Sequence, residues 1–518
     1  MRSRAILLAV IVSGTLYGPL RLSADEPSKT AEAPPAAGTE TTPPDAAAAP
    51  AAAEKNASKQ LADEYELQKL FADTLDQVER NYVKDISRRE LMEAAIHGVL
   101  SKLDQYSNYI SPDDLGQFKT SVENQFGGIG IQIDIRRESI IVISPLVGSP
   151  AYRAGIQAGD RIVEIEGKST ADIRTTDEAA AKLKGEPGTT VNITTLRPST
   201  RERKTLAIER EVVHMETVMG DRRKDTDDSW DFMLDHERKI GYIRITSFGR
   251  DTERDLARAL DELKKLNLRG LVLDLRSNPG GLLTSAIGVA DLFVTSGKIV
   301  STEGRNTKSR SWDAEKDGTY EGFPMVVLVN RYSASASEIV SACLQDHKRA
   351  VVVGERTWGK GSVQNVIELE GGKSALKLTT ASYQRPSGKN IHRFPDAKES
   401  DEWGVLPDPG YEVKLDENEF YQQMNNRHDR DILLVNHHVP RDAAAAGKPA
   451  GSETQPPVAA DAAKPAVQDD KKASPAATGE GNAAASDEAA AAAQKPAFVD
   501  RQLQKAVDFL TGELAKAG

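Results

Sequence analysis

Apolar residues follow three different spacings along this chain, and the changes between them mark regions of different architecture. Between residues 60 and 121 the apolar positions recur every three to four residues, as on one face of a helix. The pattern predicts an N-terminal helical region with two apolar faces. One face is formed by Leu67, Leu70, Phe71, Leu75 and Val78, and the other by Leu91, Ala95, Val99 and Leu103.

Residues 122–212 carry short runs of alternating apolar and polar residues that are separated by glycines, as in a small sheet. Near their start, the loop Gly127-Gly128-Ile129-Gly130 offers successive backbone N–H groups. Such groups can hold the carboxylate of a peptide C-terminus, and the next strand edge can add the peptide as an extra strand. An ordinary glycine-rich hairpin tip is the alternative interpretation. The predicted elements are strands at 129–133, 140–143, 159–167, 191–196 and 204–208, and helices from 149 and 176.

From residue 239 onward, apolar strands alternate with segments of helical spacing, and this alternation predicts a layered sheet with crossover helices. We assign residues 213–442 to this α/β core. Its predicted strands lie at 240–245, 271–275, 325–329, 350–354, 362–369 and 375–383, and its helices at 256–263, 282–293 and 335–345.

The two ends of the chain differ from the body. Residues 1–24 have the features of a secretory signal: basic residues, an apolar stretch and a small-residue cleavage site at Ala24, with an uncleaved membrane anchor as the alternative. Residues 25–59 and 443–497 are rich in Ala and Pro and predict disordered linkers. Residues 498–518 predict an amphipathic helix that docks on the body or on a partner chain.

Composition narrows the functional classes. The 518 residues carry 67 basic and 78 acidic side chains, a net charge of −11, which argues against a nucleic-acid binder. Cys343 is the one cysteine, so neither an intramolecular disulfide nor a cysteine-built zinc site can form. Outside the N-terminal segment, no apolar stretch is long enough for a multispanning membrane protein.

Three strand ends of the α/β core carry unusual residues. Such ends meet at one edge of a parallel sheet, where sites form in these folds. The first is the segment 276–281, Arg-Ser-Asn-Pro-Gly-Gly, whose glycines leave backbone N–H groups free to face a developing oxyanion. An ordinary strand-to-helix turn is the alternative for this segment.

The second strand end is Ser-Ala-Ser-Ala-Ser-Glu at 333–338, at the start of a predicted helix. The helix dipole and the free N–H groups there favour negative charge on a nearby oxygen. Helix capping can explain Ser333, but it does not account for three serines.

The third strand end is the segment 354–361, Gly-Glu-Arg-Thr-Trp-Gly-Lys-Gly. It nearly matches a phosphate-binding loop, but Gly361 replaces the magnesium-binding hydroxyl and a strand follows instead of a helix. We favour an enclosed lysine, Lys360, which can lose its proton near neutral pH and act as a general base for a serine.

These motifs and their order resemble the carboxyl-terminal processing proteases, also called tail-specific proteases, over residues 67–413. The resemblance implies an α+β multidomain protein with a crotonase-like (ββα) protease core. A PDZ domain at 122–212 is inserted in it, with residues 127–130 as the carboxylate-binding loop. It also implies an exported serine endopeptidase with a Ser-Lys acyl-enzyme mechanism that acts at protein C-termini.

Carried over residue by residue, the resemblance makes Ser335 the nucleophile and Lys360 the base, with Gln364 orienting the lysine. Gly280, Gly281 and Ala336 match the oxyanion hole. Glu338, Asp346 and Thr357 match residues that support activity through structure. The chain departs from the family at 103–109, where Leu-Asp-Gln-Tyr-Ser-Asn-Tyr replaces the usual Asp-Pro-His-Ser motif.

The implied partners are proteins with apolar C-terminal tails, and a lipoprotein adaptor and a homodimer are further options. No metal or other cofactor is implied, and the expected location is the periplasm or cell envelope. One rival interpretation is a catalytically silent PDZ scaffold. Another is a tricorn-like serine–histidine protease, for which His214 and His236 are the upstream candidates. A surface helix end is the preferred interpretation of His347 beside Asp346, and a solvated loop that of His437-His438.

Overall fold

The computed structural model of the protein describes residues 49–136, 138–433 and 498–517. The predicted signal segment 1–24 and linker 443–497 lie outside the described residues. Among the helices that are described, none combines the length and apolar character needed to cross a membrane.

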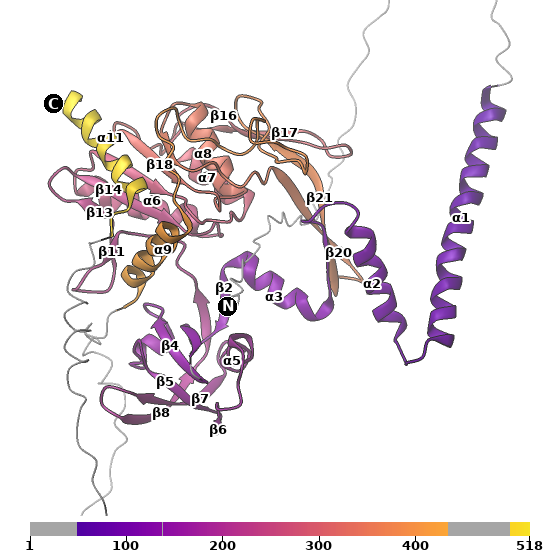
Figure 1. Ribbon diagram of the computed structural model, residues 1–518, viewed down its shortest axis with the longest axis horizontal. Coiled ribbons are helices and arrows are strands. Elements are labelled where there is room, and N and C mark those ends of the chain that lie inside the picture. The colour runs from indigo at the N-terminus through magenta and orange to yellow at the C-terminus, as the bar shows by residue number, and fades with distance from the viewer. Residues whose placement is uncertain (1–48, 137, 434–497, 518) are drawn as a thin grey trace, which may run out of the picture.

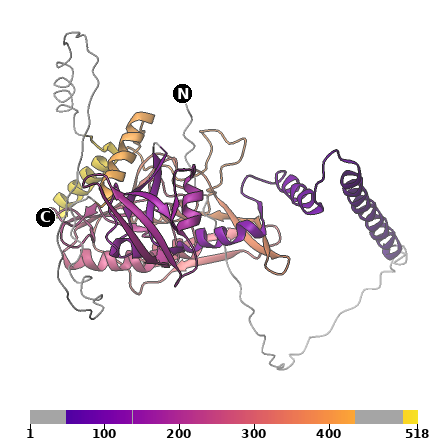
Figure 2. The same cartoon turned by 90° about the horizontal axis from the view of Figure 1, so that it is seen from below.

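Three helices precede the first sheet. The first of them begins at Ala49, inside the stretch 25–59 that is predicted to be a linker. Alanine has the highest intrinsic helix propensity, so the alanine-rich residues extend this helix toward the N-terminus. In Figures 1 and 2 this helix stands away from the rest of the molecule. The helices are α1 (Ala49–Asn81), α2 (Arg88–Leu100) and α3 (Pro112–Glu123).

A small antiparallel sheet with its own apolar core follows, in the strand order β3-β4-β5-β7-β8. Its entering strand β2 (Gln125–Gly128) pairs with its leaving strand β9 (Glu211–His214), so both connections to the core run side by side. The other elements are β3 (Ile131–Arg136), β4 (Ser139–Pro145), α4 (Pro150–Arg153), β5 (Arg161–Ile165), β6 (Lys168–Ser169), α5 (Thr176–Leu183), β7 (Thr190–Arg197) and β8 (Glu202–Glu209).

The core is built on a second sheet whose central strands run parallel, in the order β10-β14-β15-β18-β19. Every residue of β15 and β18 is buried, as expected for strands covered on both faces. The strands are β10 (Val218–Met219), β13 (Met233–Asp235), β14 (Ile240–Ile245), β15 (Gly270–Asp274), β18 (Met325–Val329) and β19 (Val351–Gly354).

Helices cover both faces of this parallel sheet. On one face, α6 (Thr252–Lys265), α7 (Leu283–Asp291) and α8 (Ala336–Asp346) contribute to the largest apolar cluster. On the other face lies α11 (Arg501–Ala517), whose Ala506 and Leu510 are fully buried (Figure 1). The terminal helix therefore docks on the body, where it covers side chains of β14, β15, β18 and β19.

A third sheet lies beside the parallel one and is built around the long strand β21 (Ser374–Gln384). Its neighbour β1 (Asn108–Ile110) comes from the N-terminal region, which is thereby joined to the α/β core. The other strands of this sheet are β16 (Gly297–Glu303), β17 (Arg310–Ala314) and β20 (Ser362–Leu369). Outside it lie the separate strand pair β11 (Arg222–Arg223) and β12 (Trp230–Asp231) and the helix α9 (Glu417–Asp431).

Candidate active site

The three unusual strand ends meet at one edge of the parallel sheet. Strands β15, β18 and β19 are adjacent and parallel, so their carboxyl ends lie side by side. The segment 276–281 follows β15, the serine-rich segment follows β18, and the lysine loop follows β19. Residues that are far apart in the sequence are thereby brought into one buried site.

Ser335 is the one serine of its motif whose hydroxyl has no structural bond. Ser333 Oγ donates to the carbonyl of Leu275 (2.8 Å), and Ser337 Oγ donates to that of Asn278 (2.9 Å). Ser335 Oγ is buried and has no hydrogen-bond partner among the described residues. Helix capping therefore does not explain this hydroxyl.

The backbone at Ser335 adopts a sparsely populated conformation, with φ of 56° and ψ of −112°. Such strain persists only where the surrounding structure enforces it, and it is frequent at active sites. Here the preceding residue, Ala334, donates its N–H to the carbonyl of Asn278 (3.0 Å), while helix α8 begins directly after Ser335. The serine is thus held at a sharp strand-to-helix turn.

Glu338 joins the serine turn to the lysine loop. Its carboxylate accepts the N–H of Ser335 (2.7 Å) and that of Lys360 (2.8 Å) on one oxygen. The other oxygen accepts the hydroxyl of Thr357 (2.6 Å) and the N–H of Gly359 (2.6 Å). Burial raises the pKa of Glu338 to about 7, although all four donors favour the charged form.

Lys360 lies in a buried environment that disfavours its charge. Its side chain is buried, and this burial lowers the pKa to about 8, with a further lowering from the nearby charge of Lys377 and an opposing effect from Glu338. The Lys360 Nζ atom lies 5.1 Å from the ring centre of Tyr106. Since Ser335 Oγ has no hydrogen-bond partner in the described part of the chain, the lysine and serine side chains are not bonded to each other in this conformation.

Gln364 lies on β20 and presents a free acceptor. Its Nε2 donates to the hydroxyls of Ser362 (2.8 Å) and Thr379 (3.3 Å). Its Oε1 is buried and has no partner among the described residues. An amide oxygen left open beside the lysine loop can accept a hydrogen bond from an ammonium group.

The glycine pair packs directly against the serine turn. A Cβ atom on Gly280 would come within 2.8 Å of the Ser335 Cβ and 3.0 Å of the Ala336 nitrogen, so only glycine fits. The Gly280 N–H already donates to Asn278 Oδ1 (2.8 Å), which differs from the predicted role in the oxyanion hole. The N–H groups of Gly281 and Ala336 have no acceptor among the described residues and are the better candidates.

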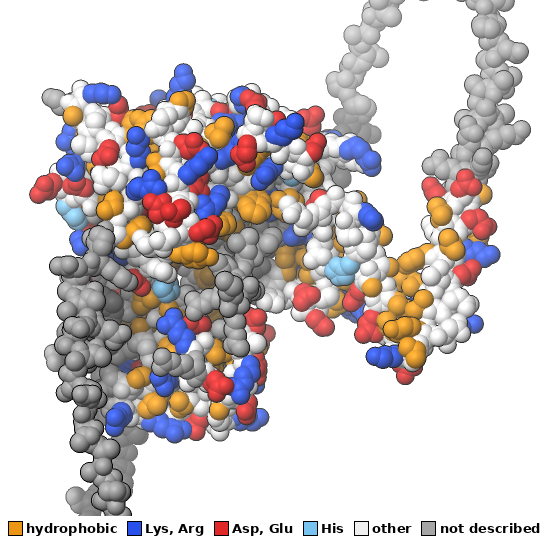
Figure 3. Space-filling model, viewed as in Figure 1, with side chains coloured by type: hydrophobic (Ala, Val, Ile, Leu, Met, Phe, Trp, Pro, Cys, Tyr) orange, Lys and Arg blue, Asp and Glu red, His pale blue; other side chains and the backbone are white. Residues whose placement is uncertain are grey.

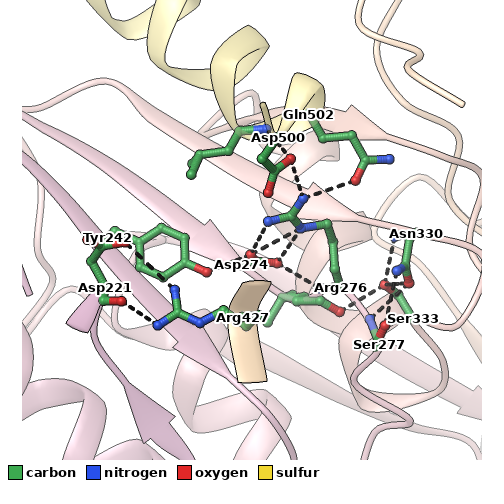
Figure 4. A network of polar contacts seen from close by, with 12 residues as sticks. Asp221, Tyr242, Asp274, Arg276, Ser277, Asn330, Ser333, Arg427, Asp500 and Gln502 are labelled. Atoms are coloured by element: carbon green, nitrogen blue, oxygen red, sulfur yellow. Dashed lines mark hydrogen bonds and ion pairs between the residues drawn. The ribbon is translucent and has the colours of Figure 1, made fainter. Parts of the chain in front are cut away.

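A polar network that the sequence analysis did not identify supports this edge of the sheet (Figure 4). Arg276 is buried after β15 and binds Asp274 (2.6 Å), Asp500 (2.9 Å) and Gln502 (3.1 Å). The next residue, Ser277, donates its N–H to Asn330 Oδ1 (2.9 Å) in the loop before the serine motif. The signal in the sequence was an arginine and an aspartate flanking the end of a fully apolar strand.

The other two supporting residues, Asp346 and Thr357, have no hydrogen bond to Ser335 and hold surrounding elements in place. Asp346, near the end of α8, binds Arg385 at 2.6 and 3.0 Å, which ties this helix to the third sheet. Thr357 donates to Glu338 and accepts the N–H of Val405 (2.7 Å). Both residues fix elements of the site.

Three of the described histidines, among them the two upstream candidates for a serine–histidine mechanism, are engaged elsewhere. His347 bonds to the backbone carbonyl of Lys298 (2.8 Å), His236 pairs with Asp231 (3.1 Å), and His214 lies 3.5 Å from Asp251. No contact joins any of these three to Ser335, whose hydroxyl has no partner in the described chain. His437 and His438 lie outside the described residues.

The predicted carboxylate-binding loop leads into an open sheet edge. Gly127 and Gly128 pair with Val212 and Glu211 between β2 and β9, and Ile129 is buried. Gly130 has a φ of 73°, and its carbonyl accepts the Ser149 hydroxyl (2.9 Å). The following strand β3 lies at the edge of its sheet and contacts α5.

Comparisons with known proteins assign the class. Residues 239–408 match peptidase family S41, residues 141–197 match the PDZ domain, and residues 36–113 match the activating protease CtpB N-terminal domain. The chain is therefore a serine-type peptidase with a PDZ domain, which confirms those two predictions.

Comparison with individual proteins identifies the family more closely. A carboxy-terminal-processing protease of Bartonella bacilliformis is 36% identical over 385 residues, which cover 73% of this chain and 83% of that protein. The carboxy-terminal processing protease CtpA of Bacillus subtilis is 33% identical over 382 residues, 70% and 78% of the two chains. This chain belongs to the carboxy-terminal processing proteases.

A solved structure gives a further match. The photosystem II D1 C-terminal processing protease is 28% identical, with a TM-score of 0.37, and the match covers 67% of this chain and 93% of that one.

Proposed function

We propose that this chain is an exported endopeptidase that cleaves proteins at or near their C-terminal tails, with Ser335 as nucleophile and Lys360 as general base. The single observation that carries the proposal is the carboxylate of Glu338, which binds the N–H groups of Ser335 and Lys360 on one oxygen. It locks the two loops into one unit, while the Ser335 hydroxyl stays free of structural bonds.

The mechanism requires Lys360 to be neutral, and its burial supplies that condition near pH 8. Proton transfer requires the lysine side chain to bring Nζ within hydrogen-bonding distance of Ser335 Oγ. As Ser335 Oγ attacks the substrate carbonyl carbon, its proton passes to Nζ. The N–H groups of Gly281 and Ala336 receive the carbonyl oxygen as it becomes negative.

The second half of the reaction returns the proton. Charged Lys360 gives it to the leaving amine, and the free acceptor of Gln364 holds the lysine during this step. A water molecule then loses a proton to neutral Lys360 and attacks the acyl-enzyme ester. Charged Lys360 returns this proton to Ser335 Oγ as the new C-terminus is released, which restores the free Ser335 hydroxyl.

Tail recognition is assigned to the PDZ domain. Strand β3 lies at the edge of its sheet beside α5, and its residues Ile131, Ile133 and Ile135 are only partly buried against the domain core. An extended apolar tail can pair with this edge and place its carboxylate at residues 127–130. Export is proposed on the N-terminal pattern of residues 1–24, with the periplasm or cell envelope as destination.

A second copy of the chain is the partner proposed for α1. The helix exposes large apolar side chains, with 66% of Leu67, 63% of Leu70 and 43% of Phe71 accessible. Figure 3 shows apolar side chains gathered where α1 approaches α2. An apolar face of this kind on a projecting helix is typical of an association surface.

The experiment uses purified residues 25–518 and an unfolded protein that ends in an apolar tail, with Ser335→Ala and Lys360→Ala as matched variants. We expect the wild type to degrade the protein and both variants to lose at least about 10³-fold in rate. The same substrate with an amidated C-terminus serves as the control for tail recognition. Near-full activity of Lys360→Ala would instead favour a serine–histidine mechanism, and binding without cleavage by the wild type would favour a scaffold.

A further inference from the structure

The segment 103–109, which departs from the family motif, reaches the Lys360 side chain. Strand β1 pairs antiparallel with β21, with Asn108 opposite Lys377 and Ile110 opposite Ala375. The turn just before β1 is thereby carried over the loop that contains Lys360. Tyr106 lies in this turn and is half-buried.

The aromatic ring of Tyr106 contacts both the lysine and the loop that carries it. Lys360 Nζ lies 5.1 Å from the ring centre, within the range of a cation–π interaction. The Tyr106 hydroxyl accepts a hydrogen bond from Trp358 Nε1 (3.3 Å), two residues before the lysine. The ring therefore lies over the ammonium group and is fixed at its outer end.

The backbone around Tyr106 is fixed as well. Asp104 accepts the N–H groups of Tyr106 (2.7 Å) and Ser107 (2.8 Å) and the hydroxyl of Ser107 (2.9 Å). The same Ser107 hydroxyl accepts the N–H of Thr379 on β21 (3.1 Å). Thr379 also accepts from Gln364, so the turn and the lysine-orienting glutamine share one support.

We propose that Tyr106 is a positioning residue for the general base, and that its ring face holds the ammonium of Lys360 and stabilises the charged lysine. The proposal rests on the Ser335–Lys360 mechanism proposed above. Charged Lys360 exists between proton uptake from Ser335 and proton delivery to the leaving amine. A ring beside Nζ stabilises that state and covers the lysine from water.

The other titratable groups around the lysine come from different elements. Lys377 on β21 disfavours the ammonium, whereas Glu338 on α8 favours it. Asp104 precedes Tyr106 in the same turn, and His392 lies against Gly361. Because these groups stay in place when Tyr106 is replaced, a change in the titration of Lys360 reports on the ring.

The variants distinguish the effect of the Tyr106 ring from the effect of the turn that holds it. Tyr106→Leu keeps an apolar cover but removes the π face, and Tyr106→Phe keeps the face but loses the bond to Trp358. Ser107→Ala weakens the docking of the turn without touching Lys360. If Tyr106→Leu does not fold, Tyr106→Met takes its place.

The measurement is the pH dependence of kcat/KM between pH 6 and 10. We expect Tyr106→Leu to shift the acid limb down by about 0.5–1 pH unit, since loss of the cation–π contact favours neutral lysine. Tyr106→Phe and Ser107→Ala keep the wild-type midpoint, whatever their rates. An acid limb of Tyr106→Leu that superimposes on the wild type overturns the proposal.

A second readout does not depend on catalysis. In a Ser335→Ala background, NMR of side-chain-labelled lysine follows the titration of Lys360, which is assigned by its absence in Lys360→Met. The same downward shift on Tyr106→Leu is expected, and an unchanged midpoint overturns the proposal. If Lys360→Ala kept full activity, the proposed mechanism would fail, while this titration would still decide whether the Tyr106 ring stabilises charged Lys360.

Discussion

Arg276 and Asp500 are 224 positions apart in the sequence, yet Arg276 Nη1 donates to Asp500 Oδ1 at 2.9 Å. Both side chains are largely buried, and Gln502 bonds to the same guanidinium nitrogen. Arg276 stands directly before the loop that carries Gly280 and Gly281. The terminal helix therefore contributes to the support of the candidate oxyanion site.

We predict that Asp500→Ala destabilises the protein by roughly 1–3 kcal/mol, because a buried guanidinium loses one of its partners while Asp274 remains. Peptidase activity falls as well, since the loop after Arg276 loses support. Urea unfolding and the rate on an unfolded substrate measure the two effects. Asp508→Ala, at an exposed site on the same helix, should stay within about 0.5 kcal/mol. Equal stability of the two variants would contradict the prediction.

We predict that activity increases with pH through about 8, because Lys360 must be neutral and its pKa is lowered to about 8 by burial and by Lys377. Below that value the active fraction, and with it kcat/KM, drops by about tenfold per pH unit. The check is kcat/KM from pH 6 to 10 at constant ionic strength. A profile that is flat from pH 6 to 9 would exclude Lys360 as the base.

Lys360→Met should abolish activity and increase stability near neutral pH. The lysine pKa falls from its ordinary value of 10.5 to about 8 on folding, so folding disfavours its charged form. Below pH 8 the buried lysine is charged, so its charge destabilises the folded wild type by the full amount. Between pH 8 and 10.5 the unfolded state binds more protons, so wild-type stability rises with pH.

The expected gain for Lys360→Met is about 1–3 kcal/mol at pH 7, and it disappears above about pH 10.5. Urea unfolding of both proteins at several pH values measures it. The exposed Lys373→Met serves as the control and should change stability by less than about 0.5 kcal/mol. A gain that does not vary with pH would show that removal of the buried charge is not its cause.

A protein with Leu67, Leu70 and Phe71 replaced by serine should lose self-association. These exposed side chains form the apolar face of α1 that we propose to contact a second copy. Size-exclusion chromatography with light scattering should report a dimer for the wild type and a monomer for the triple variant. Lys69→Ser, off that face, should remain dimeric. A monomeric wild type at micromolar concentration would contradict the proposed dimer.

The predictions from sequence succeeded where a signal is local. Strand–helix alternation located β14, β15, β18 and β19, because buried parallel strands read as continuous apolar runs. The start of the first helix was misjudged. Composition marked residues 25–59 as a linker, whereas α1 begins at Ala49 because alanine also propagates helices.

Several features of the site had no local signal. Glu338 was placed among the supporting residues, but its four donors come from two loops that meet only in the folded core. The sequence marks residues 103–109 only as a departure from the family motif, whereas the pairing of β1 with β21 carries the ring of Tyr106 to Lys360. Gly280 was assigned to the oxyanion hole, but its N–H is bonded to Asn278.

By itself, the sequence determined the family, the order of the main strands and helices in the small antiparallel sheet and the parallel sheet, and Ser335 and Lys360 as the candidate pair. Each of these can be recognised from short motifs or from periodic apolar positions, because such signals involve only residues close together in the sequence. The tertiary structure decided which amides remain free, where the terminal helix docks, and which side chains surround the lysine. Those properties arise from contacts between segments up to hundreds of residues apart, and only packing of the completed sheets brings them together.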